Sequence, residues 1–182
     1  MHTKLKKINE GFTIVETLIV LAIAALIITI VLIAVPDLQR SARNTDILHD
    51  AQNVAAAVQS YESNNQGALP GVNANPQPGP TITIQGPGGT GVAATAKVQA
   101  SDKVYFANYS SGLAIAYKSP GTSAGISGST LGPGQILVVY DAECGTAGNT
   151  NTLTSNNRAV AVLYPIESGS GATNGSVACV QE

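Results

Sequence analysis

The feature that most constrains this chain is an uncharged apolar segment near its beginning, residues 17–35. These 19 residues contain no Asp, Glu, Lys or Arg. In an α-helix, which rises about 1.5 Å per residue, they would cover about 28 Å, close to the thickness of the hydrocarbon core of a bilayer. The sequence therefore predicts a membrane-spanning helix, assigned to residues 12–35, with Glu16 as its only charged side chain.

The segment before this helix, residues 1–11, is short, polar and basic. An ordinary secretory signal is cleaved after its apolar core, whereas here the long apolar segment has the length of a span that is kept. Lys4, Lys6 and Lys7 place the N-terminal end of the span on the cytoplasmic side, because positive charges stay in the cytoplasm. Arg40 and Arg43 follow the span and reduce this bias.

Glu16 is unusual because it lies inside the apolar helix. A carboxylate near the centre of a membrane costs about 2.5–3.5 kcal/mol, and less towards the edge. The residues alone allow two interpretations. The side chain reaches the membrane boundary, or it forms a buried ion pair once some event supplies a positive charge nearby.

The residues around Glu16 resemble a known motif. The sequence GFTIVE at residues 11–16, followed by TLIVLAI, closely resembles the prepilin motif of type IV pilins and type II secretion pseudopilins. The resemblance covers about residues 4–65. It implies that a prepilin peptidase removes leader residues 1–11 by cutting between Gly11 and Phe12, and methylates the new amine of Phe12. It also implies that Glu16 neutralises the Phe12 amine of a neighbouring subunit during assembly.

The chain departs from this family pattern at two positions. Thr17 replaces the apolar residue that usually follows the Glu, a mild change because a helical Thr can bond its hydroxyl to the preceding turn. The family often carries a proline within the span, whereas here Pro36 lies at its outer end. Pro36 predicts a kink or local opening of the helix there.

Residues 36–66 are predicted to continue as an amphipathic stem helix. Apolar residues recur at steps of three and four and form one stripe: Ile47, Ala51, Val54, Val58 and Tyr61. Asn64 to Gly67, with Pro70 just beyond, indicates where the helix ends. A single helix from Phe12 to Asn65 would be about 80 Å long.

Residues 67–182 have the composition of a β-rich globular head. Residues 67–102, with five prolines and many glycines, predict a long irregular connection with a short strand at 81–84. Alternating small and β-branched residues predict further strands, separated by turn-rich segments 119–134 and 145–157: these strands are 103–109, 113–118, 135–140 and 159–164. The predicted class is α+β, a long N-terminal helix packed on a C-terminal antiparallel sheet, which is the fold that the pilin resemblance implies.

The two cysteines, Cys144 and Cys179, both lie in the head. In an exported protein an oxidising compartment favours a disulfide between them. Two free thiols remain an alternative, and a metal pair is disfavoured because no His lies nearby. The expected disulfide-bounded C-terminal region is similar to that of many pilins.

Composition gives little support to other function classes. The net charge is −2, and −4 without residues 1–11, so strong binding to nucleic acid is not expected. The only histidines are His2 and His49, which leaves little for a Ser-His-Asp site. The segment 86–91 is Gly-rich but lacks the end of a phosphate loop and is interpreted as a flexible loop. Asp141 and Glu143 could bind Ca²⁺ but are more often solvated. We predict no enzyme, cofactor or metal site.

The sequence thus favours a structural subunit of a type IV pilus, used for adhesion, motility or DNA uptake. Its expected partners are copies of itself, the prepilin peptidase, the assembly machinery with minor pilins, and the membrane. Before assembly the subunit would lie in the cytoplasmic membrane with its N-terminus in the cytoplasm, and afterwards in an extracellular filament. The alternatives are a pseudopilin of a type II secretion system and a monomeric membrane-anchored binding protein or hydrolase.

Overall fold

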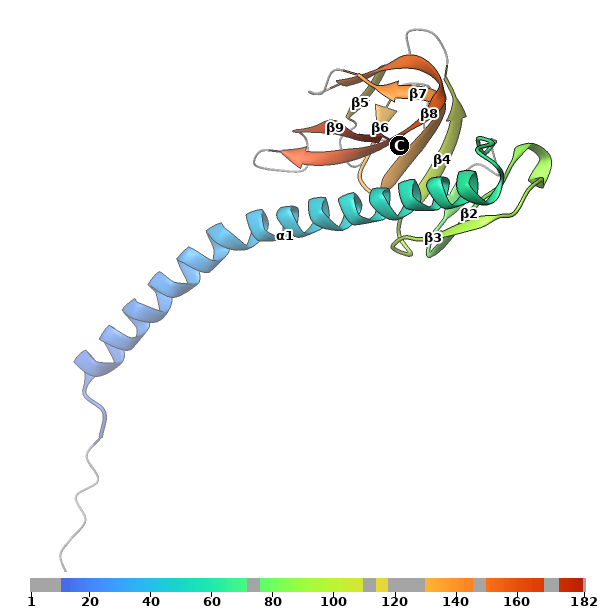
Figure 1. The fold of residues 1–182 in the computed structure, drawn as a ribbon. Coiled ribbons are helices and arrows are strands. Elements are labelled where there is room, and N and C mark those ends of the chain that lie inside the picture. The colour runs from blue at the N-terminus through green and yellow to red at the C-terminus, as the bar shows by residue number, and fades with distance from the viewer. Residues whose placement is uncertain are drawn as a thin grey trace, which may run out of the picture. The chain divides into compact units, whose positions relative to one another are not determined.

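A computed structural model describes residues 11–71, 76–109, 114–117, 130–145, 150–168 and 174–181 (Figure 1). A helix, α1, runs from Ile14 to Asn64, with Pro36 inside it. The chain divides into two compact units, one ending at Gln39 and the other beginning at Arg40. The apolar half of α1 belongs to the first unit, and the second half of α1 belongs to the second unit together with all described strands.

The described strands form one seven-stranded sheet and one two-stranded sheet. Their bounds are β1 (Gln77–Pro78), β2 (Thr81–Ile84), β3 (Ala94–Lys97), β4 (Lys103–Asn108), β5 (Ala114–Tyr117), β6 (Thr130–Leu131), β7 (Gln135–Cys144), β8 (Thr150–Ser168) and β9 (Asn174–Gln181). The larger sheet has the order β1-β4-β7-β8-β5-β6, and β9 pairs with β8. The β4–β7 and β5–β6 pairs are parallel, and the other pairs are antiparallel.

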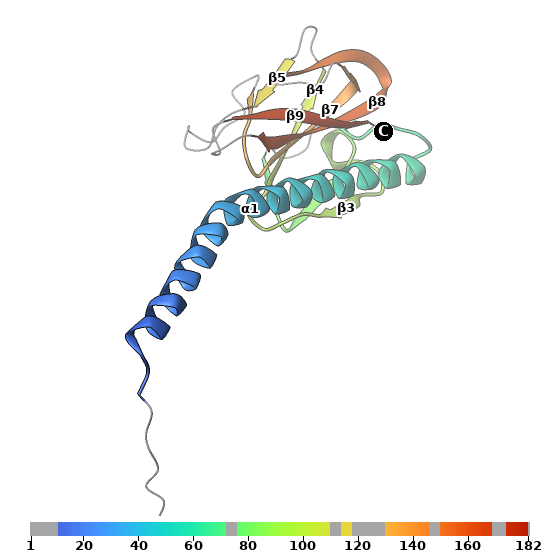
Figure 2. The same ribbon diagram turned by 90° about the vertical axis from the view of Figure 1, so that its left-hand side faces the viewer.

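The second half of α1 packs on the larger sheet and on the β2–β3 hairpin (Figures 1 and 2). All five residues of the predicted stripe are buried: Ile47, Ala51, Val54, Val58 and Tyr61. They share one cluster with Ile82 and Ile84 of the hairpin and with Val104 and Val138 of the sheet. The predicted class, a long N-terminal helix on a mostly antiparallel sheet, is confirmed.

Both faces of β7 are buried, so it differs from a half-exposed strand. Ile136 and Val138 face the cluster that contains α1, while Leu137 and Val139 belong to a second cluster with Leu153 and Val177. A continuous apolar run is typical of a strand that is buried on both faces. The segment ILVVY, residues 136–140 of β7, has this pattern.

Three sequence predictions in the head need correction. The segment 145–157 is not all turn, because β8 already begins at Thr150. Its residues Leu153 to Ser155 pair with the end of β7 across a bulge at Asp141, whose φ of 57° is a conformation that Asp tolerates better than most residues. Residues 67–102 are not simply irregular, because they hold the β2–β3 hairpin. The strand β9 was not predicted. Of the predicted strand 113–118, Leu113 and Lys118 lie outside the described residues.

The Gly-rich segment 86–91 forms a defined turn against the end of α1. The Asn65 side chain donates to the Val92 carbonyl over 3.0 Å and accepts the Val92 N–H over 2.7 Å. A Cβ atom at Gly91, whose φ is +82°, would lie 2.6 Å from the Tyr61 hydroxyl. Glycine is therefore needed at position 91 for close packing and for a left-handed backbone.

Candidate functional site

The segment at the start of α1 holds the residues singled out from the sequence. Gly11, Phe12 and Thr13 precede the helix, which begins at Ile14. The Thr13 hydroxyl oxygen accepts the backbone N–H of Glu16 over 3.3 Å. This is the contact that an N-cap residue makes with one of the unpaired N–H groups of the first turn. The cap was not predicted, although the spacing Thr13-x-x-Glu16 is the signature of a capping box.

Glu16 lies in the first turn of α1 and is exposed in the isolated chain. A carboxylate near a helix N-terminus interacts favourably with the partial positive charge of the helix dipole. Phe12, just before the helix, is 82% exposed. The structure therefore brings Phe12 and Glu16 to the same end of α1 with both side chains accessible to another molecule.

The hydroxyl groups in the apolar half of α1 are bonded within the helix. Thr17 donates to the carbonyl of Ile14 and Thr29 donates to the carbonyl of Ala25, each over 2.8 Å. The prediction that Thr17 bonds to the preceding turn is confirmed. Because these polar groups have partners inside the helix, they can enter an apolar environment without an unsatisfied donor.

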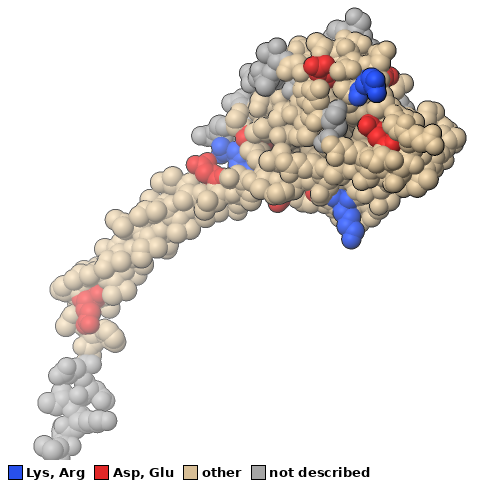
Figure 3. All heavy atoms as spheres, in the orientation of Figure 1, with Lys and Arg blue, Asp and Glu red and all other residues tan. Residues whose placement is uncertain are grey.

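The large apolar side chains in the first half of α1 are exposed. From Ile14 to Ile33, every Leu, Ile and Val is between 49% and 79% exposed. The helix is long and apolar enough to cross a membrane, a property that signal sequences near an N-terminus share. Charged side chains are nearly absent from this part of the surface (Figure 3). Such a surface needs lipid or other apolar helices around it.

The second predicted site is the disulfide region of the head. Cys144, at the end of β7, is bonded to Cys179 in β9, with the Cα atoms 5.9 Å apart. The bond joins two strands that both pair with β8, and both cysteines pack against the cluster of Leu137 and Leu163. This is the pairing predicted from the sequence.

The acidic pair beside Cys144 is divided by the bulge in β7. Asp141 lies at the bulge, while the Glu143 carboxylate accepts a hydrogen bond from the Asn156 side chain over 3.0 Å. No three His, Cys, Asp or Glu side chains among the described residues gather as a metal site would require. Pro36 lies within α1, and a kink at this proline stays a prediction.

The comparisons with known proteins identify the start of the chain. The sequence pattern of the prokaryotic N-terminal methylation motif matches residues 6–32. Comparison with curated proteins and with solved structures finds no match. The matched residues include Gly11, Phe12 and Glu16 and most of the exposed apolar helix. The chain therefore carries the front motif that type IV pilins and pseudopilins share.

Proposed function

We propose that this chain is the structural subunit of a type IV pilus. The observation that carries the proposal is the exposed apolar helix that begins directly at the methylation motif, with Glu16 as its one charged residue. In this proposal residues 1–11 are the leader, residues 12–35 form the membrane and filament-core helix, residues 36–66 form the stem, and residues 67–182 form the head.

Processing prepares the subunit for assembly. A prepilin peptidase cuts between Gly11 and Phe12 in the cytoplasm and methylates the Phe12 amine, which can still carry a positive charge. The processed subunit waits in the cytoplasmic membrane, because lipid covers the apolar side chains of α1. The assembly machinery and minor pilins then move it into an extracellular filament, where other copies of the same helix replace lipid.

Glu16 determines the register in which a new subunit docks. The Phe12 amine of one subunit and the Glu16 carboxylate of its neighbour both lose water in the filament core, so each needs the other. Removing one partner of a buried ion pair destabilises by about 3–5 kcal/mol. A subunit that docks in the correct register pairs both groups, and a misplaced subunit leaves them unpaired.

The second candidate is a pseudopilin of a type II secretion system, since the front motif is common to both classes. The disulfide-bounded end of the head favours the pilus. A monomeric membrane-anchored binding protein is the third candidate. It would leave unexplained why the chain carries the methylation motif.

Mass spectrometry of the mature protein tests the processing step. The expected N-terminal residue is methylated Phe12, and Gly11→Val is expected to leave the uncut precursor in the membrane. A mature chain that begins after the apolar helix, near Ala34, would show an ordinary secretory signal and refute the proposal.

The assembly step is tested with Glu16→Ala as the sole subunit in the cell. We expect processed, stable protein in the membrane and few or no filaments by electron microscopy. Glu16→Gln, which keeps the shape and removes the charge, should have the same effect. Normal filament numbers in both variants would show that the ion pair does not drive docking. If cells with the natural chain form no filaments, and if deleting the chain stops the secretion of a substrate protein, the pseudopilin would be favoured.

A further inference from the structure

Two buried carboxyl groups meet where the stem helix contacts the turn before β4. Asp50, on α1, is 7% exposed, and Asp102, directly before β4, is 5% exposed. Carboxylates are rarely buried to this extent unless they are paired. Among the described residues, no Lys or Arg forms an ion pair with either of them.

Hydrogen bonds fasten the turn 99–102 to the helix through Asp50. Its Oδ2 atom accepts the backbone N–H of Gln99 over 2.7 Å. The same turn is closed by the Asp102 N–H, which donates to the Gln99 carbonyl over 3.1 Å. Asp102 also binds the segment between β1 and β2, because its backbone carbonyl accepts the Gly79 N–H over 2.9 Å. A change in the charge of the two carboxyl groups therefore alters how firmly the turn 99–102 is attached to α1.

Asp50 binds one end of the turn 99–102 and Asp102 forms its other end, so the two buried carboxyl groups lie near each other, and a proton on one of them removes their repulsion. Burial, followed by the interaction with the neighbouring Asp50 carboxyl group and its negative charge, raises the pKa of Asp102 to about 6. The Ser101 hydroxyl, which donates to Asp102 Oδ1 over 3.3 Å, lowers this pKa, and the charge of Asp46 raises it.

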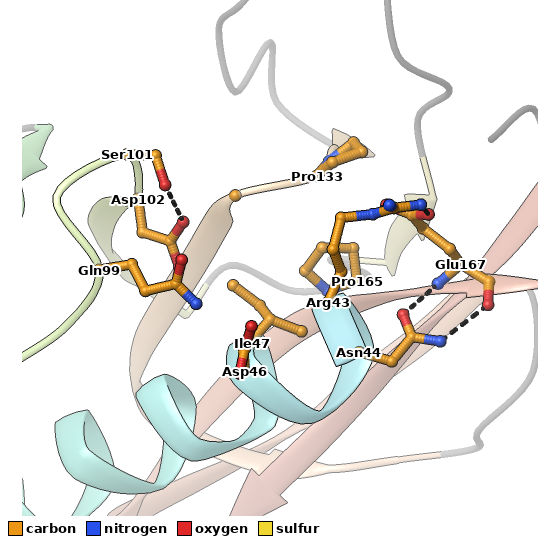
Figure 4. A pocket seen from close by; sticks show the side chains of 11 residues that line it. Arg43, Asn44, Asp46, Ile47, Gln99, Ser101, Asp102, Pro133, Pro165 and Glu167 are labelled. Carbon is orange, nitrogen blue, oxygen red and sulfur yellow. Dashed lines mark hydrogen bonds and ion pairs between the residues drawn. The ribbon is translucent and has the colours of Figure 1, made fainter. Parts of the chain in front are cut away.

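The surrounding charged groups do not neutralise the pair. Asp102 and Asp46 line a pocket of about 290 Å³, together with residues of the β6–β7 turn and the end of β8 (Figure 4). The basic side chain at this pocket, Arg43, binds the Glu167 carboxylate over 2.6 Å. Lys103, the next residue after Asp102, is exposed. The nearby acidic group, Asp46, adds to the negative charge.

We propose that Asp50 and Asp102 share one proton and form a pH-dependent latch between the stem helix and the turn before β4. The latch is closed in mildly acidic surroundings. As the pH rises and the proton leaves, two negative charges face each other in a buried site, and the turn loosens from the helix.

The direction of the pH effect follows from the two states of the head. Between about pH 4 and pH 6 the folded pair holds a proton that the unfolded chain has already lost. The stabilisation that the pair contributes therefore falls as the pH rises through this window and is greatest below it. A shift from 3.8 to about 6 corresponds to a rise of about fiftyfold in the unfolding equilibrium constant between pH 4 and pH 7.

Carbon NMR of the aspartate carboxyl groups measures the shared proton directly. The full chain, in detergent micelles with EDTA, carries only five aspartates, so each resonance can be assigned by single substitutions. We expect one carboxyl signal to titrate near pH 6, and to be absent from Asp102→Asn. If all five titrate below pH 4.5, the proposal is overturned.

Asp102→Asn tests the consequence for the fold. The amide can donate to Asp50 without a shared proton, so the turn should stay closed at every pH. We expect the variant to lose the fiftyfold effect in urea unfolding, followed by tyrosine circular dichroism. The protection of the Gln99 amide from hydrogen exchange, corrected for intrinsic rates, should fall between pH 5 and pH 7 in the natural chain and remain constant in the variant. Asp46→Asn is the control and should keep most of the pH dependence.

Two results would overturn the latch. One is an equal pH dependence of Gln99 protection in the natural chain and in Asp102→Asn. The other is a return of full protection at pH 7.5 on adding Ca²⁺ or Mg²⁺ without EDTA, because this would make the pair a cation site. The NMR titration is made on the natural chain, so it decides the proposal even if a variant fails to fold.

Discussion

The two halves of α1 share one backbone but are stabilised in different ways. The apolar half, residues 14–35, exposes nearly all its large side chains, while the second half, residues 40–64, buries a stripe of small and medium apolar residues under a sheet. Val20 is 61% exposed and Val54 is fully buried. The same residue type is therefore exposed in one half and packed in the chain's own core in the other.

This difference shows why an average hydrophobicity, taken over the whole chain, is misleading. The apolar half is uniformly hydrophobic around its circumference, which is typical of a helix surrounded by lipid or by other helices. The second half alternates between a buried and a solvated face, which is typical of a helix on the surface of a domain. The head is thus stabilised by contacts within the chain. The exposed side chains of the apolar half would need contacts with lipid or with other helices.

Removing the disulfide is expected to have the largest effect, and this effect should be confined to the stability of the head. Cys144→Ser should lower the stability of the head by up to about 4 kcal/mol, because the bond closes a loop with a sequence separation of 35. Its effect on membrane insertion should be negligible, since the apolar half holds no cysteine. Urea unfolding of the full chain in micelles measures the first quantity, and membrane fractionation measures the second.

Cys144→Ser/Cys179→Ser is the matched control, since it removes the crosslink without leaving a free thiol. Both variants should be destabilised to a similar extent. A head whose unfolding midpoint is unchanged under reducing conditions would contradict this prediction. So would two free thiols in the exported protein.

A matched pair of valine substitutions tests the comparison most directly. Val54→Ala should destabilise the head by about 2 kcal/mol, because it removes buried methyl groups and leaves a cavity between α1 and the sheet. Val20→Ala removes the same atoms from an exposed position and should leave the unfolding of the head unchanged. Equal effects of the two variants on urea unfolding would show that the halves are not independent.

The sequence predicted the helix and its stripe well, because both depend on local spacing. Ile47, Val54 and Tyr61 follow the 3.6-residue period that buries one face of a helix. Glu16 and the cysteine pair were also recognisable, since a charge in an apolar helix is rare and two cysteines allow only one pairing within the chain.

The parts that could not be predicted depend on long-range pairing. The strand β8 begins inside a segment rich in Asn and Thr, and what makes it a strand is its pairing with β5 and β7. The turn at Gly91 is fixed by Tyr61 and Asn65, which are distant in sequence. In the same way Asp50 lies on the stem helix, whereas its buried neighbour Asp102 comes from the turn before β4, so their proximity is not visible in the sequence.

The smallest expected effect concerns the first turn of the apolar half, at the cap made by Thr13. Cleavage after Gly11 would leave Thr13 as the second residue of the processed chain, so the cap would persist in the mature subunit. In Thr13→Ala the Glu16 N–H loses its side-chain acceptor, which destabilises a helix end by about 1 kcal/mol. We expect hydrogen exchange at the Glu16 amide to become about fivefold faster in micelles. Thr13→Ser keeps the hydroxyl and should exchange at nearly the natural rate. The second half of α1 should be unaffected in both variants, because Asn65 fixes its far end through Val92. If the Glu16 amide exchanges equally in Thr13→Ala and Thr13→Ser, the first turn depends on its surroundings, as the rest of the apolar half does, and not on its own cap.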